Sequence, residues 1–190
     1  TEVYIHLIEE TIKSGKQVLY LLPEIALTTQ IITRLRRHFG DKVGVYHSRY
    51  SSNERIEVWN QVNRFSETDT EGVFLKSQIV LGARSALFLP YSKLGLVIVD
   101  EEHDSSYKQN DPAPRYHGRD TAIVLAKFHG AKVLLGSATP SLESYYNALA
   151  GRYGLVRLNQ RFGGVLMPEI VVADVKEAMR KKIMKSHFRS

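Results

Sequence analysis

The sequence predicts an α/β protein whose mostly parallel sheet is covered by helices on both faces. The first observation is a set of short, continuous apolar runs, bounded by turn residues, at 17–23, 42–47, 78–82, 94–100, 131–137 and 169–174. Runs without polar alternation are typical of strands that are buried on both faces. The second observation is that segments with helical spacing separate most of these runs. This alternation favours right-handed strand–helix–strand crossovers.

Each predicted helix has a recognisable apolar face or start. The second follows a potential cap at Thr28, and the third follows a capping-box pattern formed by Ser51 and Glu54. A fourth is expected after 119–120, and Pro140 is expected to be the first residue of a fifth. The apolar faces of the first four are Val3, Leu7, Ile8 and Ile12; Ile31, Ile32 and Leu35; Ile56, Trp59 and Val62; and Val124, Leu125 and Phe128.

The composition is that of an ordinary globular domain, with 43% hydrophobic and 24% charged residues in a chain of 190. The absence of Cys excludes disulfides and thiolate zinc sites within these residues. No apolar run approaches the roughly 20 residues that cross a bilayer, so a cytoplasmic protein without membrane contact is expected. Because the chain opens with Thr1-Glu2 inside a helical pattern, we expect it to be part of a longer protein.

The net charge of +6 is concentrated in the tail, where residues 176–190 hold six Lys and Arg against one Glu. A basic helix is more often a solvated face than a phosphate contact, so this excess alone is weak evidence for nucleic-acid binding. The pattern predicts a domain over 1–174, followed by a basic amphipathic helix or linker over 175–190.

The predicted strand at 94–100 leads directly into carboxylates. Asp100 is the first residue to emerge from it, and a carboxylate held so rigidly suits a phosphate-bound Mg²⁺. The next residue, Glu101, can orient or deprotonate a water that attacks a γ-phosphate. The structural alternative is a polar strand exit in which Asp100 caps the next element. This segment alone does not decide between them.

Other strand ends favour a phosphate-rich ligand. The strand at 131–137 continues into Ser137 and Thr139, beside the acidic strand end. Two further strands end in a turn followed by a hydroxyl residue, Thr28 or Ser85, at a potential helix start, where backbone N–H groups bind anions. Each is an ordinary cap when taken singly. Together they place anion-binding groups along one edge of the sheet.

Several motifs in order resemble superfamily 2 helicases, and more closely the first motor lobe of the PriA family of replication-restart helicases, also called primosomal protein N′. The motifs are "LLPEIALTTQ", "YHSRYSSNER", "GARSALFLPYSKLGLVIVDEEHDSSYKQ", "PRYHGRD" and "GSATPSLES". The resemblance covers nearly the whole chain and weakens after about residue 158. It implies a RecA-like P-loop NTPase lobe and ATP-driven 3′-to-5′ translocation on single-stranded DNA in replication restart.

Carried onto this sequence, the resemblance implies that Asp100 holds Mg²⁺, that Glu101 is the catalytic base and that His103 couples nucleotide state to DNA. It also implies that Ser137 and Thr139 relay between ATP and DNA. The loop after His103 resembles an aromatic-rich loop that senses DNA, in which aromatic rings stack on bases and cations contact phosphates. The residues expected to contact DNA are Thr28, Gln30, Arg84, Ser85, Tyr107, Lys108, Arg115, Tyr116 and Arg119. An ordinary salt bridge is an equal alternative for Arg84.

The phosphate loop of this family has the form GxxxxGK[ST], and the opening of this chain resembles the segment directly after its Lys. Thr1 is therefore expected to be the last residue of that loop, a ligand of ATP and Mg²⁺. Without the rest of the loop and a second lobe, the chain alone is expected to hydrolyse ATP negligibly. Zinc is expected only in the missing part of the parent protein. The expected partners are single-stranded and forked DNA, with primosome and single-strand-binding proteins.

Two other functions stay open at this point. A metal-dependent nuclease or hydrolase could use Asp100, Glu102 and His103 directly on a cation, because Asp100 and Glu102 share a face of an extended segment. A non-catalytic module could bind DNA weakly and in a salt-dependent manner.

Overall fold

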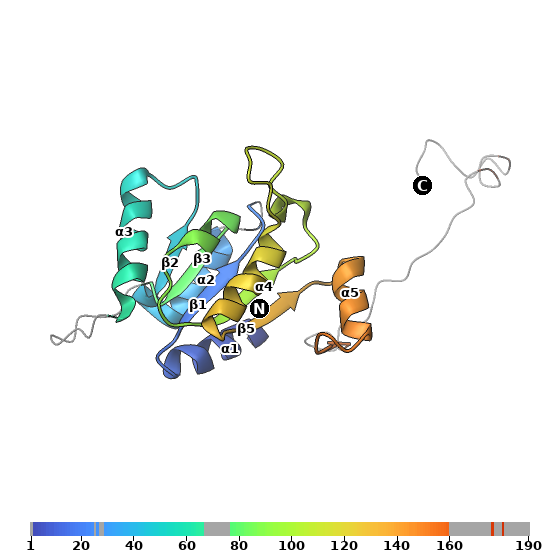
Figure 1. Cartoon of the computed structure of the whole chain (residues 1–190), viewed down its shortest axis with the longest axis horizontal. Helices are drawn as coiled ribbons and strands as arrows, with labels where there is room; N and C mark the ends of the chain where they lie inside the picture. Colours follow the sequence, from blue (N-terminus) through green and yellow to red (C-terminus); the bar gives the residue numbers. More distant parts are fainter. Residues whose placement is uncertain are drawn as a thin grey trace. The chain divides into compact units, whose positions relative to one another are not determined.

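The structure is a computed structural model that describes residues 2–24, 26, 29–66, 77–159, 176 and 180. The described strands form one parallel sheet in the order β2-β3-β1-β4-β5, which confirms the predicted fold class (Figure 1). The strands are β1 (Gln17–Leu21), β2 (Val43–Tyr46), β3 (Ile79–Gly82), β4 (Leu94–Asp100) and β5 (Lys132–Gly136). Each coincides with a predicted apolar run, and the run at 169–174 lies outside the described residues.

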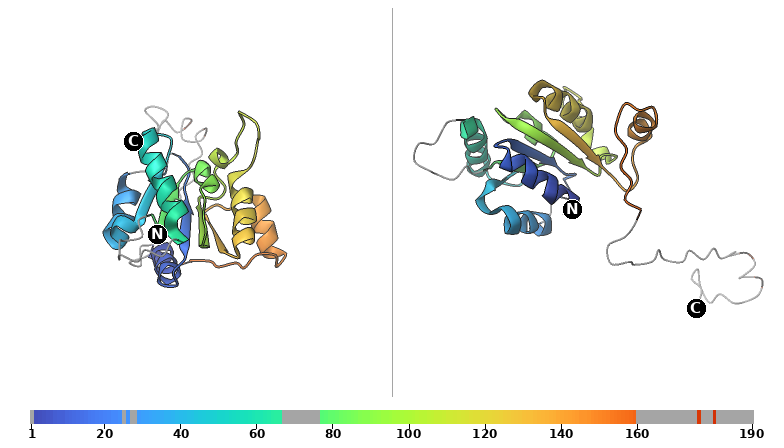
Figure 2. Two further views of the ribbon diagram at one scale, coloured as in Figure 1. Left: turned by 60° about the vertical axis from the view of Figure 1, so that its left-hand side comes forward. Right: turned by 90° about the horizontal axis from the view of Figure 1, so that it is seen from below.

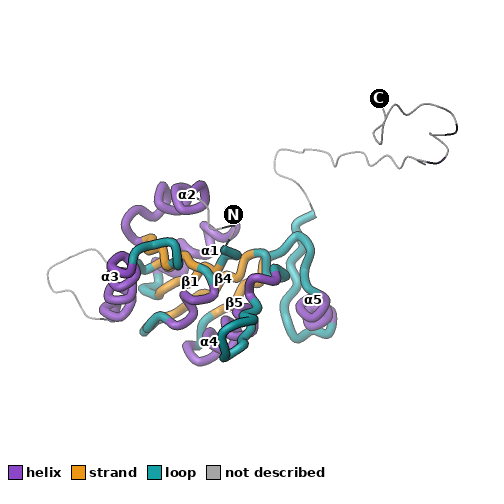
Figure 3. Tube along the Cα trace, turned by 90° about the horizontal axis from the view of Figure 1, so that it is seen from above, coloured by secondary structure: helices purple, strands orange, loops and turns teal. Residues whose placement is uncertain are grey.

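The central strands are buried because helices cover both faces. Every residue of β1 and β3 is buried, and β1 pairs with β4 over Val18–Leu21 opposite Leu96–Val99. One core cluster joins the sheet to α1 (Glu2–Lys13) and α2 (Thr29–Phe39). The other joins it to α3 (Ser52–Asn63) and α4 (Gly118–His129). Figures 2 and 3 show these two helical layers on opposite sides of the strands.

The helix boundaries follow local chemistry, with three differences from the sequence-based expectation. Helix α4 begins at Gly118, before residues 119–120 rather than after them. The capping box of Ser51 and Glu54 is present at the start of α3. Helix α5 (Leu142–Leu149) begins after Ser141, whose side chain accepts a hydrogen bond from Ser144 N, so Pro140 is not its first residue. Ser85 is the second residue of a five-residue 3₁₀ turn, Arg84–Phe88, that Ala83 precedes. A serine hydroxyl at the N-cap accepts a hydrogen bond from an N–H of the first turn that has no partner within the helix.

The chain divides into two compact units, residues 1–152 and residues 153–190. The sheet and helices α1 to α5 lie in the first unit. The expected domain boundary at 174/175 and nearly all of the expected basic helix lie outside the described residues, and both stay predictions. Within the part of the chain that the structure describes, no helix is long and apolar enough to span a membrane.

Candidate active site

The carboxyl ends of the described strands lie at one edge of the sheet, because each of their pairings is parallel. The chain places β2 and β3 on one side of β1, then β4 and β5 on the other. Open parallel sheets bind ligands at such a switch point, beyond the strand ends. Asp100 ends β4 there and is in register with Gly136, which ends β5. The fold therefore brings Asp100 beside Ser137, as the sequence predicted.

Three tyrosines fix Asp100 in place. The Tyr4 hydroxyl donates to Oδ1 at 3.0 Å, the Tyr20 hydroxyl to Oδ2 at 2.9 Å, and the Tyr107 hydroxyl to the backbone oxygen at 2.7 Å. Burial, followed by the charge of Asp100, raises the pKa of each phenol, so all three remain donors. A Cβ on Gly136 would overlap the Tyr4 hydroxyl, so the glycine permits this approach. The half-buried carboxylate is therefore oriented by the fold.

Glu101 occupies an unusual backbone conformation. Its φ is 47°, in the left-handed region that residues other than Gly rarely adopt. Its side chain is 48% exposed, whereas the next residue, Glu102, is only 2% exposed. The backbone N–H of Asp104 donates to the Glu101 oxygen at 2.8 Å and closes the turn. The turn thus presents one carboxylate to solvent and buries its neighbour.

The buried carboxylate of Glu102 accepts four hydrogen bonds. Oε1 accepts from the Ser141 N–H at 2.6 Å, and Oε2 accepts from the hydroxyls of Ser141 at 3.0 Å and Ser144 at 2.8 Å and from Arg119 Nη1 at 3.0 Å. Burial raises the pKa of Glu102, but these bonds together hold it below its ordinary value. Glu102 is therefore an ionised residue of the interior.

His103 joins the acidic turn to the turn after β5. Its Nδ1 lies 2.7 Å from the Ser137 hydroxyl, and its Nε2 lies 3.4 Å from the Thr139 hydroxyl. Ser137 Oγ also accepts from the Thr139 N–H at 2.9 Å. The carboxylate of Glu101 lies 3.7 Å from His103 Nδ1. The sequence-predicted catalytic set of Asp100, Glu101, His103, Ser137 and Thr139 therefore forms one cluster.

This geometry disfavours the metal-dependent nuclease. Glu102 does not share a face with Asp100, because the turn at Glu101 directs it toward Arg119 and the start of α5. Among the residues that the structure describes, no group of three His, Cys, Asp or Glu could hold a metal ion.

The loop between β4 and α4 is fastened at its base. Arg84 Nη1 donates to the backbone oxygens of Ser106 at 2.7 Å and Lys108 at 3.1 Å. Arg84 thus supports the loop and forms no salt bridge with a described residue, and its predicted phosphate contact stays a prediction. Tyr107 is 1% exposed and belongs to the core. Its ring has no face available for a DNA base, which argues against the predicted DNA contact of Tyr107.

The exposed part of the loop carries Lys108, Arg115 and the half-buried Tyr116. Tyr116 packs edge-to-face on Phe88, with ring centroids 5.2 Å apart. Phe88 is 64% exposed, in a 3₁₀ turn whose Ala86 and Leu87 are buried. Sequence reasoning missed Phe88. The signal that could have found it is its position directly after Ala86 and Leu87 in a short apolar segment that follows a strand end.

The remaining predicted residues are dispersed. Thr1 and Thr28 lie outside the described residues, and Arg119 is 9% exposed, with Nε bonded to Asp120 Oδ1 at 2.8 Å. Ser85 and Gln30 are exposed.

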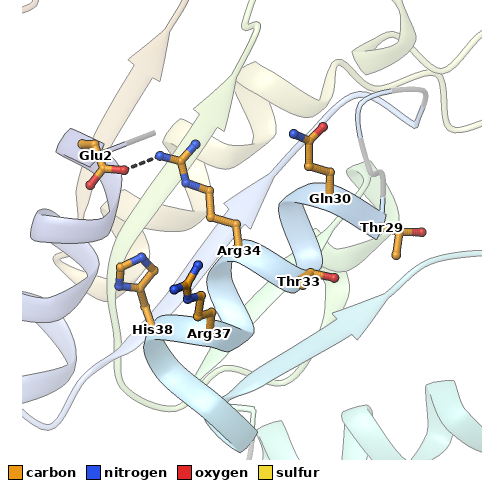
Figure 4. Close-up of a pocket in the computed structure, with 7 residues that line it drawn as sticks. All are labelled: Glu2, Thr29, Gln30, Thr33, Arg34, Arg37 and His38. Atoms are coloured by element: carbon orange, nitrogen blue, oxygen red, sulfur yellow. Dashed lines mark hydrogen bonds and ion pairs between the residues drawn. The ribbon is translucent and has the colours of Figure 1, made fainter. Parts of the chain in front are cut away.

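Gln30 lines a hollow of about 710 Å³ along the polar face of α2 (Figure 4). The other lining residues are Glu2, which contacts Arg34, and Thr29, Thr33, Arg37 and His38. The hollow does not include the acidic cluster.

Comparison with known proteins identifies the family. A family model described as DEAD/DEAH box helicase matches residues 1–148. Replication restart protein PriA of Bacillus subtilis is 42% identical over 180 residues, covering 95% of this chain and 21% of that relative. The protein of the same name from Haemophilus influenzae is 47% identical over 176 residues, covering 93% and 23%. The chain therefore spans between a fifth and a quarter of the length of these curated relatives.

A solved structure of RecG bound to a three-way DNA junction is similar in fold, with a TM-score of 0.51 and 19% identity over 80% of this chain and 18% of that chain. The curated relatives confirm the resemblance expected from the motifs. Because the family model covers most of its length, the chain belongs to the DEAD/DEAH box helicase family.

Proposed function

We propose that this chain is the first RecA-like motor lobe of an ATP-dependent DNA helicase with 3′-to-5′ polarity that acts in replication restart. We also propose that it works within a protein as long as its curated relatives. The observation that carries the proposal is the cluster of Asp100, Glu101, His103, Ser137 and Thr139 at the switch point of a parallel sheet. The similarity to replication restart proteins supports the cellular role.

The chemistry of Asp100 fits Mg²⁺ that is bound mainly by phosphate and water. Oδ1 accepts from the Tyr4 hydroxyl and from the Glu101 N–H at 3.2 Å, whereas Oδ2 accepts from the Tyr20 hydroxyl and keeps a lone pair for the ion. Mg²⁺ retains several waters and takes few protein carboxylates, so the lack of a three-residue cage among the described residues is compatible with it. Bound MgATP supplies the phosphoryl group and neutralises the acidic turn. Asp100, with Thr1 as a further proposed ligand, would hold the ion.

Glu101 and His103 have separate roles in this proposal. Glu101 is exposed beside Asp100, where its carboxylate can orient a water and accept its proton. His103 contacts Glu101 on one side and Ser137 on the other. A conformational change in either turn can therefore alter the other turn through these contacts of His103.

The proposed interface for single-stranded DNA lies beyond the same sheet edge. Phe88 and Tyr116 supply ring faces, while Lys108 and Arg115 supply exposed cations for phosphates. Such an interface binds without reading sequence. Thr28, Gln30 and Ser85 remain proposed contacts with the DNA backbone. Forked DNA, primosome components and single-strand-binding proteins are the proposed partners of the full-length protein, in the cytoplasm.

The test is ATP hydrolysis and strand displacement by the full-length protein, with and without single-stranded DNA. We expect hydrolysis that DNA stimulates and that Asp100→Ala abolishes. A parallel incubation of DNA with Mg²⁺ or Mn²⁺ separates the rival function. Cleavage of DNA that is lost in Asp100→Ala, without ATP hydrolysis, would replace the helicase by a nuclease.

A further inference from the structure

The acidic turn departs from the pattern that names its family. In DEAD and DEAH the third residue is Ala, whereas this chain has Glu102 between Glu101 and His103. A carboxylate in place of a methyl group adds a buried charge, which is costly unless it is paired and hydrogen-bonded. Its retention in the interior therefore calls for a physical reason.

The partners of Glu102 come from two other segments. Arg119 is the second residue of α4, at the end of the loop that carries Arg115 and Tyr116. Ser141 is the N-cap of α5, which follows the turn of Ser137 and Thr139. Arg119 Nη1 also donates to the Ser141 hydroxyl at 2.7 Å, so the three groups close a ring of hydrogen bonds. The Glu102 N–H donates to the Gly136 oxygen at 3.0 Å. One residue thus joins three segments.

The adjoining backbone needs such support. A left-handed conformation at a residue other than Gly costs of order 1 kcal/mol or more and persists only where the surroundings impose it. Glu101, with φ 47°, is such a residue. On its N-terminal side Asp100 is fixed by Tyr4 and Tyr20. On its C-terminal side the four bonds of Glu102 provide the matching constraint.

Helix α5 depends on the same ring. Leu142, Tyr146 and Leu149 are 85%, 65% and 61% exposed, so these apolar side chains contribute little to fixing the position of the helix. The bonds from Ser141 and Ser144 to Glu102 hold its first turn instead. The turn of Ser137 and Thr139, directly before α5, is thereby held between β5 and Glu102.

We infer that Glu102 and Arg119 are positioning residues for ATP hydrolysis: their ion pair, closed through Ser141, holds Glu101 in its left-handed conformation and keeps its carboxylate where it meets the attacking water. The inference rests on the proposed function. It also gives Arg119 an internal role in place of the DNA contact that the sequence suggested.

The test compares Glu102→Gln, Arg119→Gln and the double variant in the full-length protein. The Ser141 N–H and Arg119 bond to different oxygens of Glu102, and a glutamine replaces one of these oxygens by an NH₂ donor, so one of the two bonds is lost. We expect kcat for ATP hydrolysis to fall about a hundredfold in each single variant, because a small displacement of a reacting group costs that much. The KM for ATP should not change, since both side chains are buried and paired with each other. The double variant should lose no more than either single variant, because the two residues act as one unit.

The matched control is Glu143→Gln, an exposed carboxylate in the first turn of α5, which should keep the unsubstituted kcat. Thermal unfolding of every variant reports the folded fraction. A kcat that falls only in proportion to that fraction, or stays unchanged, overturns the inference while leaving the helicase in place. If the unsubstituted protein hydrolyses no ATP, the proposed function fails and the inference fails with it. Should Glu102→Gln not fold, Ser144→Ala removes one donor to Oε2 and is expected to lower kcat severalfold; an unchanged kcat there overturns the inference.

Discussion

Nδ1 of His103 lies 2.7 Å from the hydroxyl of Ser137, so side chains connect the turn after β4 to the turn after β5. The two strands are also paired in register up to Asp100 and Gly136. The Thr139 N–H donates to the same Ser137 hydroxyl. Ser137 therefore links the acidic turn to the backbone that leads into α5.

Replacing Ser137 by Ala removes both of these hydrogen bonds. The net value of one such bond is about 1 kcal/mol, and 1.4 kcal/mol corresponds to a factor of ten, so loss of the two bonds should lower strand displacement per ATP hydrolysed by about tenfold or more. The measurement is the ratio of unwinding to phosphate release in the full-length protein. Ser52→Ala, at an exposed position on α3, is the control. An unchanged ratio in Ser137→Ala would remove the relay role.

Phe88 and Arg115 should affect DNA binding in different ways. We expect Phe88→Ala to weaken binding of single-stranded DNA by about 1–3 kcal/mol, with an unchanged salt dependence, because stacking releases no counterions. Arg115→Gln should reduce the slope of log Kd against log salt by about one. A titration at several salt concentrations measures both. Phe128→Ala is the control, because Phe128 is 82% exposed but lies at the end of α4 away from the loop. Equal effects of the two Phe substitutions on DNA binding would contradict the proposal that Phe88 stacks on DNA bases.

Gly136→Ala should destabilise the protein, because the added Cβ overlaps the Tyr4 hydroxyl beside Asp100. We expect a loss of about 1–3 kcal/mol in the free energy of unfolding, measured with urea. Tyr4→Phe removes the overlapped hydroxyl, so the double variant should be less destabilised than the sum of the single variants. Gly154→Ala, in open space, should have no effect. Additive losses would mean that Gly136 and Tyr4 do not meet.

Ionisation of Glu102 should make part of the free energy of unfolding depend on pH in the acid range. Its hydrogen bonds hold its pKa below the ordinary value of a glutamate in the folded protein. The folded state therefore binds this proton less tightly than the unfolded state does. The resulting stabilisation is fully present above the unfolded pKa of about 4.3, and it is lost as the pH falls through the lower, folded pKa. Unfolding in urea between neutral and acid pH should show a shallower decline for Glu102→Gln than for the unsubstituted protein. Parallel curves would contradict this assignment.

The sequence predicted much of the fold because the strands are buried on both faces. Each described strand lies in a continuous apolar run, and the Ser51 cap was readable from local spacing. The cluster of Asp100, His103 and Ser137 was predictable from strand ends that share one edge. The roles of Glu102, Tyr107 and Arg119 were not. A left-handed turn at Glu101 reverses the expected alternation of faces, and no local pattern marks that turn.

Ion pairs between residues that are distant in the chain could not be predicted from the sequence either. Arg119 and Glu102 are 17 residues apart, and Ser141 is a further 22 residues along the chain. Long-range pairing of polar side chains depends on tertiary contacts rather than on spacing. A tyrosine within the apolar run of β1 did carry a usable signal. A buried hydroxyl needs a partner, and Tyr20 finds it in Asp100.

The most direct test of the central claim is phosphate release by Glu101→Gln in the full-length protein, with single-stranded DNA and saturating MgATP. A glutamine keeps the shape of the side chain but cannot accept a proton from water. We predict that kcat falls by at least about a hundredfold while binding of a fluorescent ATP analogue is retained. Turnover close to that of the unsubstituted protein would show that the turn after β4 is not the site of ATP hydrolysis.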